Sequence, residues 1–253
     1  MRGFGRSTRP APGDPGFDER RPFARAEEAA ADVADAIAFL RAECGHAEIA
    51  LAGFSWGTVL AGSFVAAHPD AVSRLLLYAP IYATRNPAWI ELLGDPANRE
   101  AFNPAFAAYR WTTTDALRAR WDADIPVADK EAWRAREVLD AVLSTALAAD
   151  PLSFSRAPPA FRAPNGPFVD LHRAFTGHPV FAASRIRVPV MIVRGEGDST
   201  STDADARSLL RDLGSRHRRC QAIAGGSHFA LLERAAPRLF EACEAFLETP
   251  VPG

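Results

Sequence analysis

The chain has 253 residues, of which 48% are hydrophobic and 24% are charged, and its formal net charge at pH 7 is −2. This is the composition of a folded globular protein and excludes a mainly disordered chain. The charge balance lacks the basic excess that neutralises nucleic-acid phosphates, so no nucleic-acid partner is expected. No apolar run reaches the roughly 18 residues of a membrane span, and residues 1–22 lack the apolar stretch of a secretory signal. A cytoplasmic protein without a membrane partner is therefore predicted.

The first regular elements follow a glycine-, proline- and arginine-rich opening segment. Residues 27–44 predict a helix, because apolar side chains recur at helical spacing, glutamates open the segment and Gly45 follows it. Residues 48–54 form a short apolar run typical of a parallel strand that is covered on both faces. A second helix is predicted at residues 56–68, since Pro69 disfavours helical geometry in the residue before it.

Two further buried strands are predicted at residues 73–78 and 188–194, and the segment between them has a different composition. It is rich in tryptophan, arginine and proline, with a helical stretch at residues 130–148 and a proline-rich loop at residues 151–167. An insertion of about a hundred residues between two sheet strands is typical of a helical cap over a binding site. The predicted division is a first part of the core at residues 1–79, a cap at residues 80–187 and a second part of the core at residues 188–253.

The last part of the chain continues the alternation of helices and strands. A helix is predicted near residues 203–213, a strand near residues 219–223 and a closing helix at about residues 237–247. Strands that alternate with helices in this way indicate an α/β fold with a parallel sheet flanked by helices.

The sequence Gly53-Phe54-Ser55-Trp56-Gly57 fits the pattern G-x-S-x-G between a predicted strand and a predicted helix. A turn this tight leaves the serine strained and exposed, and it requires small residues on either side. The start of the helix offers free backbone N–H groups, so the N–H of Trp56 is the expected oxyanion donor. The motif therefore predicts Ser55 as a nucleophile, and the alternative reading is a simple turn.

A nucleophilic serine needs a histidine base and an acid that orients the base. Asp198 follows the strand at residues 188–194, and His228 lies in a glycine loop after the next strand, so both are expected at the carboxyl end of the sheet. The order serine, aspartate, histidine is that of the α/β-hydrolases. Three other acidic residues compete for the role of the acid: Glu196, Asp203 and Asp205.

Metal and cofactor sites are not predicted. The six histidines show no H-x-x-x-H spacing, and the three cysteines show no C-x-x-C spacing. Because Cys44, Cys220 and Cys243 are odd in number and far apart, reduced and buried thiols are expected.

Taken together, the motifs resemble the α/β-hydrolase superfamily with a helical cap, and within it the proline iminopeptidase branch. That branch cleaves N-terminal residues from peptides, whereas neighbouring branches hydrolyse esters, lactones or amides. Thr58 departs from the branch, which commonly has a second glycine there. The segments that carry the resemblance are residues 2–7, 55–57, 68–69 and 226–229 with the loop at Asp198.

The same resemblance implies that the N-terminal strands of the sheet are absent. Residues 2–7 look like the loop after the fourth strand of the family, so roughly 60 residues are missing, including the His-Gly loop that supplies a second oxyanion donor. The strand at residues 48–54 would then have one unpaired edge. The hypothesis is a recorded start that is too late; the alternatives are a homo-oligomer that supplies the edge, or a decayed remnant. With one oxyanion donor, activity is expected to fall by about 100- to 1,000-fold.

The predicted function is hydrolysis of an ester or amide bond in a small molecule or short peptide by Ser55, His228 and Asp198 through an acyl-enzyme, without a cofactor. The alternative is a truncated or inactive protein that binds a ligand. Four tryptophans fall in the predicted cap, and most are expected in its core. An aminopeptidase would need a cap carboxylate for the substrate ammonium, and the candidates are Glu91, Glu100, Glu131 and Glu137.

Overall fold

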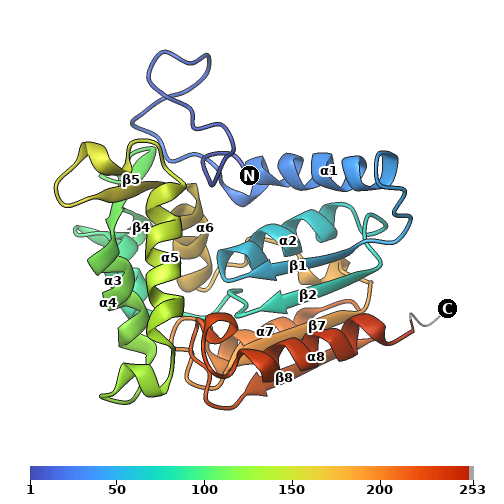
Figure 1. Cartoon of the computed structure of the whole chain (residues 1–253). Helices are drawn as coiled ribbons and strands as arrows, with labels where there is room; N and C mark the ends of the chain where they lie inside the picture. The colour runs from blue at the N-terminus through green and yellow to red at the C-terminus, as the bar shows by residue number, and fades with distance from the viewer. Residues whose placement is uncertain (251–253) are drawn as a thin grey trace.

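The computed structural model describes residues 1–250 and is built around a four-stranded parallel sheet with the strand order β1-β2-β7-β8 (Figure 1). The sequence predicts each of these strands to within a residue or two. The register aligns Phe54 with Tyr78 and Tyr78 with Val193, so β1 and β2 end at the same level and β7 continues for two more residues. The strands are β1 (Ala50–Phe54), β2 (Arg74–Tyr78), β7 (Val190–Gly195) and β8 (Arg218–Ile223).

Four helices pack on this sheet, on both of its faces. Side chains alternate between the faces of a strand, and in β2 Leu75 and Leu77 join the core formed by α1, α2 and α7, whereas Leu76 and Tyr78 join the core under α8. No helix in residues 1–250 is long and apolar enough to span a membrane. The helices are α1 (Ala26–Ala42), α2 (Trp56–Ala67), α7 (Asp203–Asp212) and α8 (Ala236–Glu248).

Strand β1 differs from its expected environment. It lies at the end of the sheet, as the sequence predicts, and only its edge toward β2 is paired among the described residues. The prediction that both faces are covered is wrong, because Ala50 and Ala52 are exposed and Phe54 is 36% exposed. Leu51, on the other face, packs against the core of α1, α2 and α7. The core under α8 contains residues of β2, β7 and β8 and none of β1, which leaves that face of β1 open.

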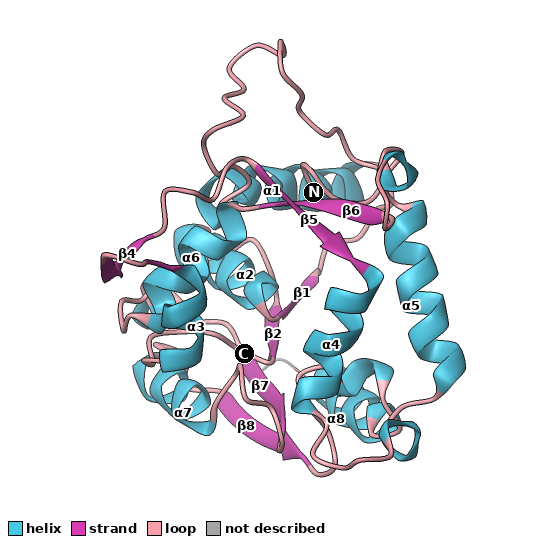
Figure 2. Cartoon of the chain, turned by 90° about the vertical axis from the view of Figure 1, so that its left-hand side faces the viewer, coloured by secondary structure: helices cyan, strands magenta, loops and turns pink. Residues whose placement is uncertain are grey.

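The segment between β2 and β7 lies beyond the carboxyl ends of the strands (Figures 1 and 2). It contains strands as well as helices, so the prediction of a purely helical insertion is wrong. Strands β3 and β4 form one antiparallel pair, and β5 and β6 form another. The elements are α3 (Pro87–Leu93), β3 (Gly94–Asp95), β4 (Asn98–Phe102), β5 (Tyr109–Thr113), α4 (Thr114–Asp124), α5 (Arg136–Ala148), β6 (Ala160–Pro164) and α6 (Gly166–Phe175).

Two local predictions within this segment are wrong in part. The helical stretch expected at residues 130–148 is interrupted: Lys130–Ala132 form a short 3-10 helix and α5 begins at Arg136. Between them, Trp133 is hydrogen-bonded to Glu233 and Arg134 forms an ion pair with Asp122. The loop expected at residues 151–167 contains β6, whose partner β5 is distant in sequence. In both places tertiary contacts override the local pattern.

The opening segment packs against the insertion rather than along the sheet. Its backbone carbonyl groups accept hydrogen bonds from Ala108 N–H at Glu19 and from Gly166 N–H at Phe23, over 2.9 and 2.8 Å. The hydroxyl of Tyr109 donates to the carbonyl of Pro10 over 3.1 Å. Residues far apart in the sequence therefore build this side of the molecule together.

The cysteines are free thiols, but the expectation that they are buried is wrong. Cys44 and Cys220 are exposed, and Cys243 is half-buried. Cys44 lies beyond the end of α1, and Cys220 lies on β8, the outer strand opposite β1. Their positions at the periphery of the fold explain the exposure.

Candidate active site

Ser55 occupies the turn between β1 and α2, in a backbone conformation that residues other than glycine rarely adopt. Its φ is +55° and its ψ is −124°, and such a backbone is strained for a residue with a Cβ atom. Local hydrogen bonds hold it: the N–H donates to the Tyr78 carbonyl over 3.0 Å, and the carbonyl accepts from the Thr58 N–H over 2.9 Å. The turn thus presents the Ser55 hydroxyl at the carboxyl end of the sheet.

The two glycines of the motif are not equivalent. A Cβ atom at Gly53 would lie 2.3 Å from the Gly57 carbonyl oxygen, so the turn closes only with glycine at position 53. A Cβ atom at Gly57 would meet no atom within 4 Å. The prediction that both sides of the turn require small residues is therefore right for Gly53 and wrong for Gly57.

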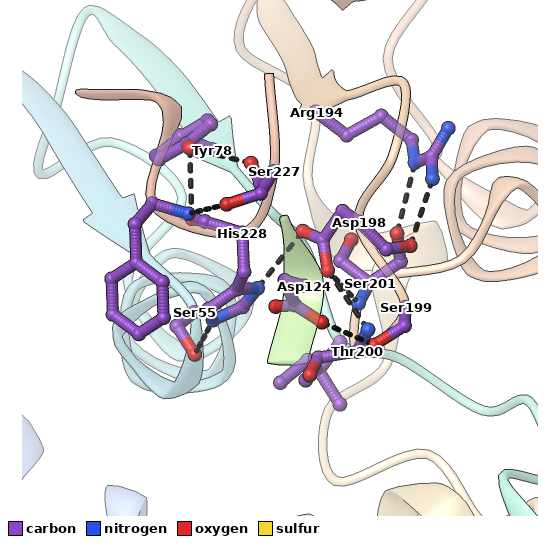
Figure 3. A network of polar contacts seen from close by, with 12 residues as sticks. Ser55, Tyr78, Asp124, Arg194, Asp198, Ser199, Thr200, Ser201, Ser227 and His228 are labelled. Carbon is purple, nitrogen blue, oxygen red and sulfur yellow. Dashed lines mark hydrogen bonds and ion pairs between the residues drawn. The ribbon is translucent and has the colours of Figure 1, made fainter. Parts of the chain in front are cut away.

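The three residues predicted as nucleophile, base and acid lie in one hydrogen-bonded row (Figure 3). His228 Nε2 lies 2.8 Å from Ser55 Oγ, and His228 Nδ1 lies 2.8 Å from Asp198 Oδ2. His228 and Asp198 are both only 4% exposed. A buried carboxylate on Nδ1 leaves Nε2 free to accept the serine proton, which is the arrangement that nucleophilic catalysis by serine requires.

The competing acids are elsewhere. Glu196 and Asp203 are exposed, and the carboxylate of Asp203 pairs with Arg207. Asp205 is buried but caps the start of α7 through Thr202, and burial raises the pKa of its carboxyl group. Of the four acidic residues that the sequence leaves open, Asp198 is the one hydrogen-bonded to the histidine.

Backbone contacts fix the loops that carry the acid and the base. The second oxygen of Asp198 accepts hydrogen bonds from the N–H groups of Thr200 and Ser201, both over 2.8 Å. The Tyr78 hydroxyl donates to the His228 carbonyl over 2.8 Å, and burial raises the pKa of this tyrosine. A Cβ atom at Gly195 would lie 2.2 Å from the Ser227 carbonyl oxygen, so glycine there lets the two loops touch.

Glu233 links the histidine loop to the insertion. Its buried carboxylate accepts hydrogen bonds from the indole N–H groups of Trp121 and Trp133, each over 2.8 Å. It also accepts from the backbone N–H of Ser227 over 2.8 Å and from the Ser227 hydroxyl. Ser227 precedes His228, so the insertion is tied to the residue next to the base. The sequence gives no local signal for this link, because its members are up to 112 residues apart.

Trp56, the predicted oxyanion donor, is the first residue of α2. Its backbone N–H has no partner within the helix and lies next to Ser55. Its indole donates to Asp170 over 3.1 Å, and Asp170 also accepts from the Ala26 N–H over 2.7 Å and the Arg25 side chain over 3.1 Å. Burial raises the pKa of Asp170. This carboxyl group therefore joins the starts of α1 and α2 to α6.

A pocket of about 270 Å³ opens at Ser55 and His228. Its wall is mainly aromatic and apolar, and two arginines, Arg110 and Arg120, stand in it. Of the tryptophans of the insertion, Trp89 lines the pocket, whereas Trp121 is completely buried. The full lining is Phe4, Phe54, Ser55, Trp56, Trp89, Arg110, Arg120, Pro167, Phe168, Leu171, Thr200, His228 and Phe229.

The four glutamates considered for binding a substrate ammonium do not line this pocket. Glu91 pairs with Arg99, Glu100 with Arg85, and Glu131 with Arg136. Glu137 is exposed on α5.

A parallel sheet that presents a serine at a strand-to-helix turn, with an acid and a histidine on later strand ends, defines an α/β-hydrolase. Comparison with protein families agrees: the family described as serine aminopeptidase, S33, matches residues 1–235. The chain belongs to this family.

Solved structures show the same fold at low sequence identity. Est816, described as an N-acyl homoserine lactone degrading enzyme, has a TM-score of 0.62 and 20% identity over 97% of this chain and 80% of its own. E-2-(acetamidomethylene)succinate hydrolase has a TM-score of 0.59 and 18% identity over 98% and 79%. The monoacylglycerol lipase of Paleococcus ferrophilus has a TM-score of 0.56 and 19% identity over 97% and 80%. No curated protein sequence gives a significant match.

Proposed function

We propose that this hydrolase cleaves an ester or amide bond of a small molecule or short peptide through a covalent acyl-enzyme. The observation that carries the proposal is the continuous hydrogen-bonded row from Ser55 through His228 to Asp198. Ser55 Oγ attacks the substrate carbonyl carbon while His228 Nε2 takes the hydroxyl proton. Asp198 holds the ring orientation and stabilises the imidazolium, and the N–H of Trp56 donates to the oxyanion.

The second half of the reaction uses the same residues. His228 gives its proton to the leaving alcohol or amine as the tetrahedral intermediate collapses, which leaves the acyl group on Ser55. A water molecule then attacks the acyl carbon, and His228 takes a proton from this water and returns it to Ser55. The acid is released and the free serine is regenerated, so no cofactor is required.

Residues 80–187 act as a cap in this proposal. Six of the pocket residues that accompany Ser55 and His228 come from this segment, so it shapes the space available to the substrate. The contribution is spread over several elements: Trp89, Arg110, Arg120, Pro167, Phe168 and Leu171.

An acyl ester is favoured over an N-terminal peptide residue as the substrate. An aminopeptidase would hold the substrate ammonium with a carboxylate, but none of the residues that line the pocket is an aspartate or a glutamate. The two charged side chains in the lining are arginines, which repel an ammonium group.

The test is hydrolysis of 4-nitrophenyl acetate and of alanine 4-nitroanilide by the wild type and by Ser55→Ala. We expect release of 4-nitrophenol from the ester, with little or no release from the anilide and a loss of at least about 1,000-fold in Ser55→Ala. Anilide cleavage that equals ester cleavage would favour the aminopeptidase alternative. Ester hydrolysis at the same rate by the wild type and by Ser55→Ala would favour the other alternative, an inactive fold that binds a ligand.

A further inference from the structure

Arg110, on β5, places a guanidinium group in the wall of the pocket that holds Ser55. One of its nitrogens is occupied, since Nη1 donates to the Pro164 carbonyl over 2.6 Å and to Asn165 Oδ1 over 3.2 Å. Nε and Nη2 form no hydrogen bond with any of residues 1–250. The side chain is thus anchored through one nitrogen, and its remaining donors are unused.

The charge of Arg110 has no counterion in the described part of the chain. No carboxylate oxygen of residues 1–250 lies within 4.0 Å of its guanidinium nitrogens. Arg120, the other arginine of the pocket, is paired with Asp124 over 2.9 Å. Burial lowers the pKa of Arg110 to about 10, so the group is still a cation at neutral pH. A desolvated cation without a partner raises the affinity of the pocket for an anion.

A second contact holds the guanidinium group. Its central carbon lies 3.8 Å from the centre of the Phe168 ring, which is within the range of a cation–π contact. With Nη1 anchored and the ring in contact, the free Nε–Nη2 edge offers two parallel donors. This pair matches the two oxygens of a carboxylate.

We propose that Arg110 binds a carboxylate of the substrate, so that the protein hydrolyses esters or amides that carry a carboxylate on the acyl or the alcohol side. The proposal rests on the proposed function for the role of Ser55 in the reaction. The rest of the lining is mainly aromatic and aliphatic, so Arg110, which has no ion-pair partner among residues 1–250, is the charge that selects between an anionic substrate and its neutral ester.

Binding is measured first, in the Ser55→Ala background, where turnover does not interfere. The probes are two matched pairs: 4-acetoxybenzoate with its methyl ester, and monomethyl adipate with dimethyl adipate. The first pair carries the carboxylate on the alcohol side and the second on the acyl side. Titration calorimetry compares Ser55→Ala alone with Ser55→Ala combined with Arg110→Gln, Arg110→Lys or Arg156→Gln. Arg156 is the matched control, because it stacks on Trp111 at 4.4 Å but does not line the pocket.

We expect Ser55→Ala to bind the anion of at least one pair more tightly than its neutral ester. Arg110→Gln should weaken binding of that anion by about 10- to 100-fold and leave the neutral ester within about 2-fold. Arg110→Lys should keep part of the preference, and Arg156→Gln should keep all of it. Equal affinities within both pairs, or an equal loss for anion and ester in Arg110→Gln, would overturn the proposal, since the latter is the result of a merely structural role beside Pro164.

The same pairs, given to the wild type as substrates, separate this inference from the proposed function. Hydrolysis that depends on Ser55 but shows no preference for the anion would overturn the role of Arg110 and leave the serine mechanism intact. Preference for the anion in binding, combined with hydrolysis that does not need Ser55, would overturn the mechanism and support the role of Arg110.

Discussion

The carboxylate of Glu233 accepts a hydrogen bond from the indole N–H of Trp121 over 2.8 Å. This bond joins the loop that carries His228 to the insertion between β2 and β7. Trp121 is completely buried and Glu233 is 5% exposed. Because the same carboxylate also binds Ser227, the position of His228 depends on the packing of the insertion.

Replacement of Glu233 by glutamine tests this link. The carboxylate receives hydrogen bonds from four donors, whereas a glutamine offers one acceptor oxygen and brings an NH₂ group against N–H donors. We expect Glu233→Gln to lower the free energy of unfolding by about 1–3 kcal/mol and to lower kcat/KM for ester hydrolysis. Urea unfolding and steady-state kinetics measure the two effects. Exposed Glu241 on α8 provides the control, and a Glu233→Gln protein no more affected than Glu241→Gln would show that the Glu233 carboxylate does not hold the histidine loop.

Asp198→Asn tests the assignment of the acid. The variant keeps an oxygen for the Thr200 and Ser201 N–H groups, but its amide no longer stabilises the imidazolium of His228. We expect kcat for ester hydrolysis to fall by roughly 1,000- to 10,000-fold while the protein stays folded. Asp203→Asn is the matched control, because Asp203 follows the same strand and was a competing candidate, yet it is exposed and pairs with Arg207. A larger loss in Asp203→Asn would reverse the assignment.

The glycines of the turn predict opposite effects of the same substitution. Gly53→Ala puts a Cβ atom 2.3 Å from the Gly57 carbonyl oxygen and should destabilise the fold by about 1–3 kcal/mol. Gly57→Ala meets no atom within 4 Å and lies in the first turn of α2, where alanine is the better helix former. We expect its free energy of unfolding to be unchanged or raised by up to about 1 kcal/mol. Equal destabilisation of both variants would show that the turn is not closed as described.

The ion pair of Asp150 and Arg162 predicts a pH dependence of stability. Burial raises the pKa of Asp150, but hydrogen bonds from Arg162 and from the backbone N–H of Leu152 outweigh this effect and lower it to about 2, from an ordinary value of 3.8. The ionised carboxylate therefore contributes about 2 kcal/mol of stability above pH 4, which is lost as the pH falls through about 2.

Urea unfolding of the wild type and of Asp150→Asn at several pH values checks this contribution. The wild type should be the more stable protein at pH 7, and the difference should shrink below about pH 4, as Asp150 becomes protonated. Asp140→Asn on the exposed side of α5 is the control. A difference that does not change between pH 7 and pH 3 would contradict the role of the charge.

The sequence predicts the sheet and the row of site residues because both follow local rules. Short apolar runs identify the four strands, and the turn at Ser55 is recognisable from its glycine spacing between a strand and a helix. Since parallel strands end at one edge, the loops after two later strands could be expected to bring Asp198 and His228 to the same edge.

The remaining features depend on contacts between distant parts of the chain. Strand β6 exists because it pairs with β5, which is distant in sequence, and Arg110 on β5 lines the pocket together with residues of several other elements. The exposure of Ala52 on β1 does not follow from the sequence, because an apolar run does not show which helices cover it. Neither Glu233 nor Arg110 has a neighbour in sequence that marks its position.

The role of Ser55 as the nucleophile is tested by labelling of the purified, folded protein with a fluorophosphonate, followed by mass spectrometry of its peptides. Fluorophosphonates react with a serine whose hydroxyl is activated by a neighbouring base, so we expect one modification, on Ser55, that is absent in Ser55→Ala and strongly slowed in His228→Ala. The ester hydrolysis rate should fall in proportion to the labelled fraction. A folded protein in which Ser55 stays unmodified, or is labelled no faster than other serines, would contradict the assignment of Ser55 as the nucleophile.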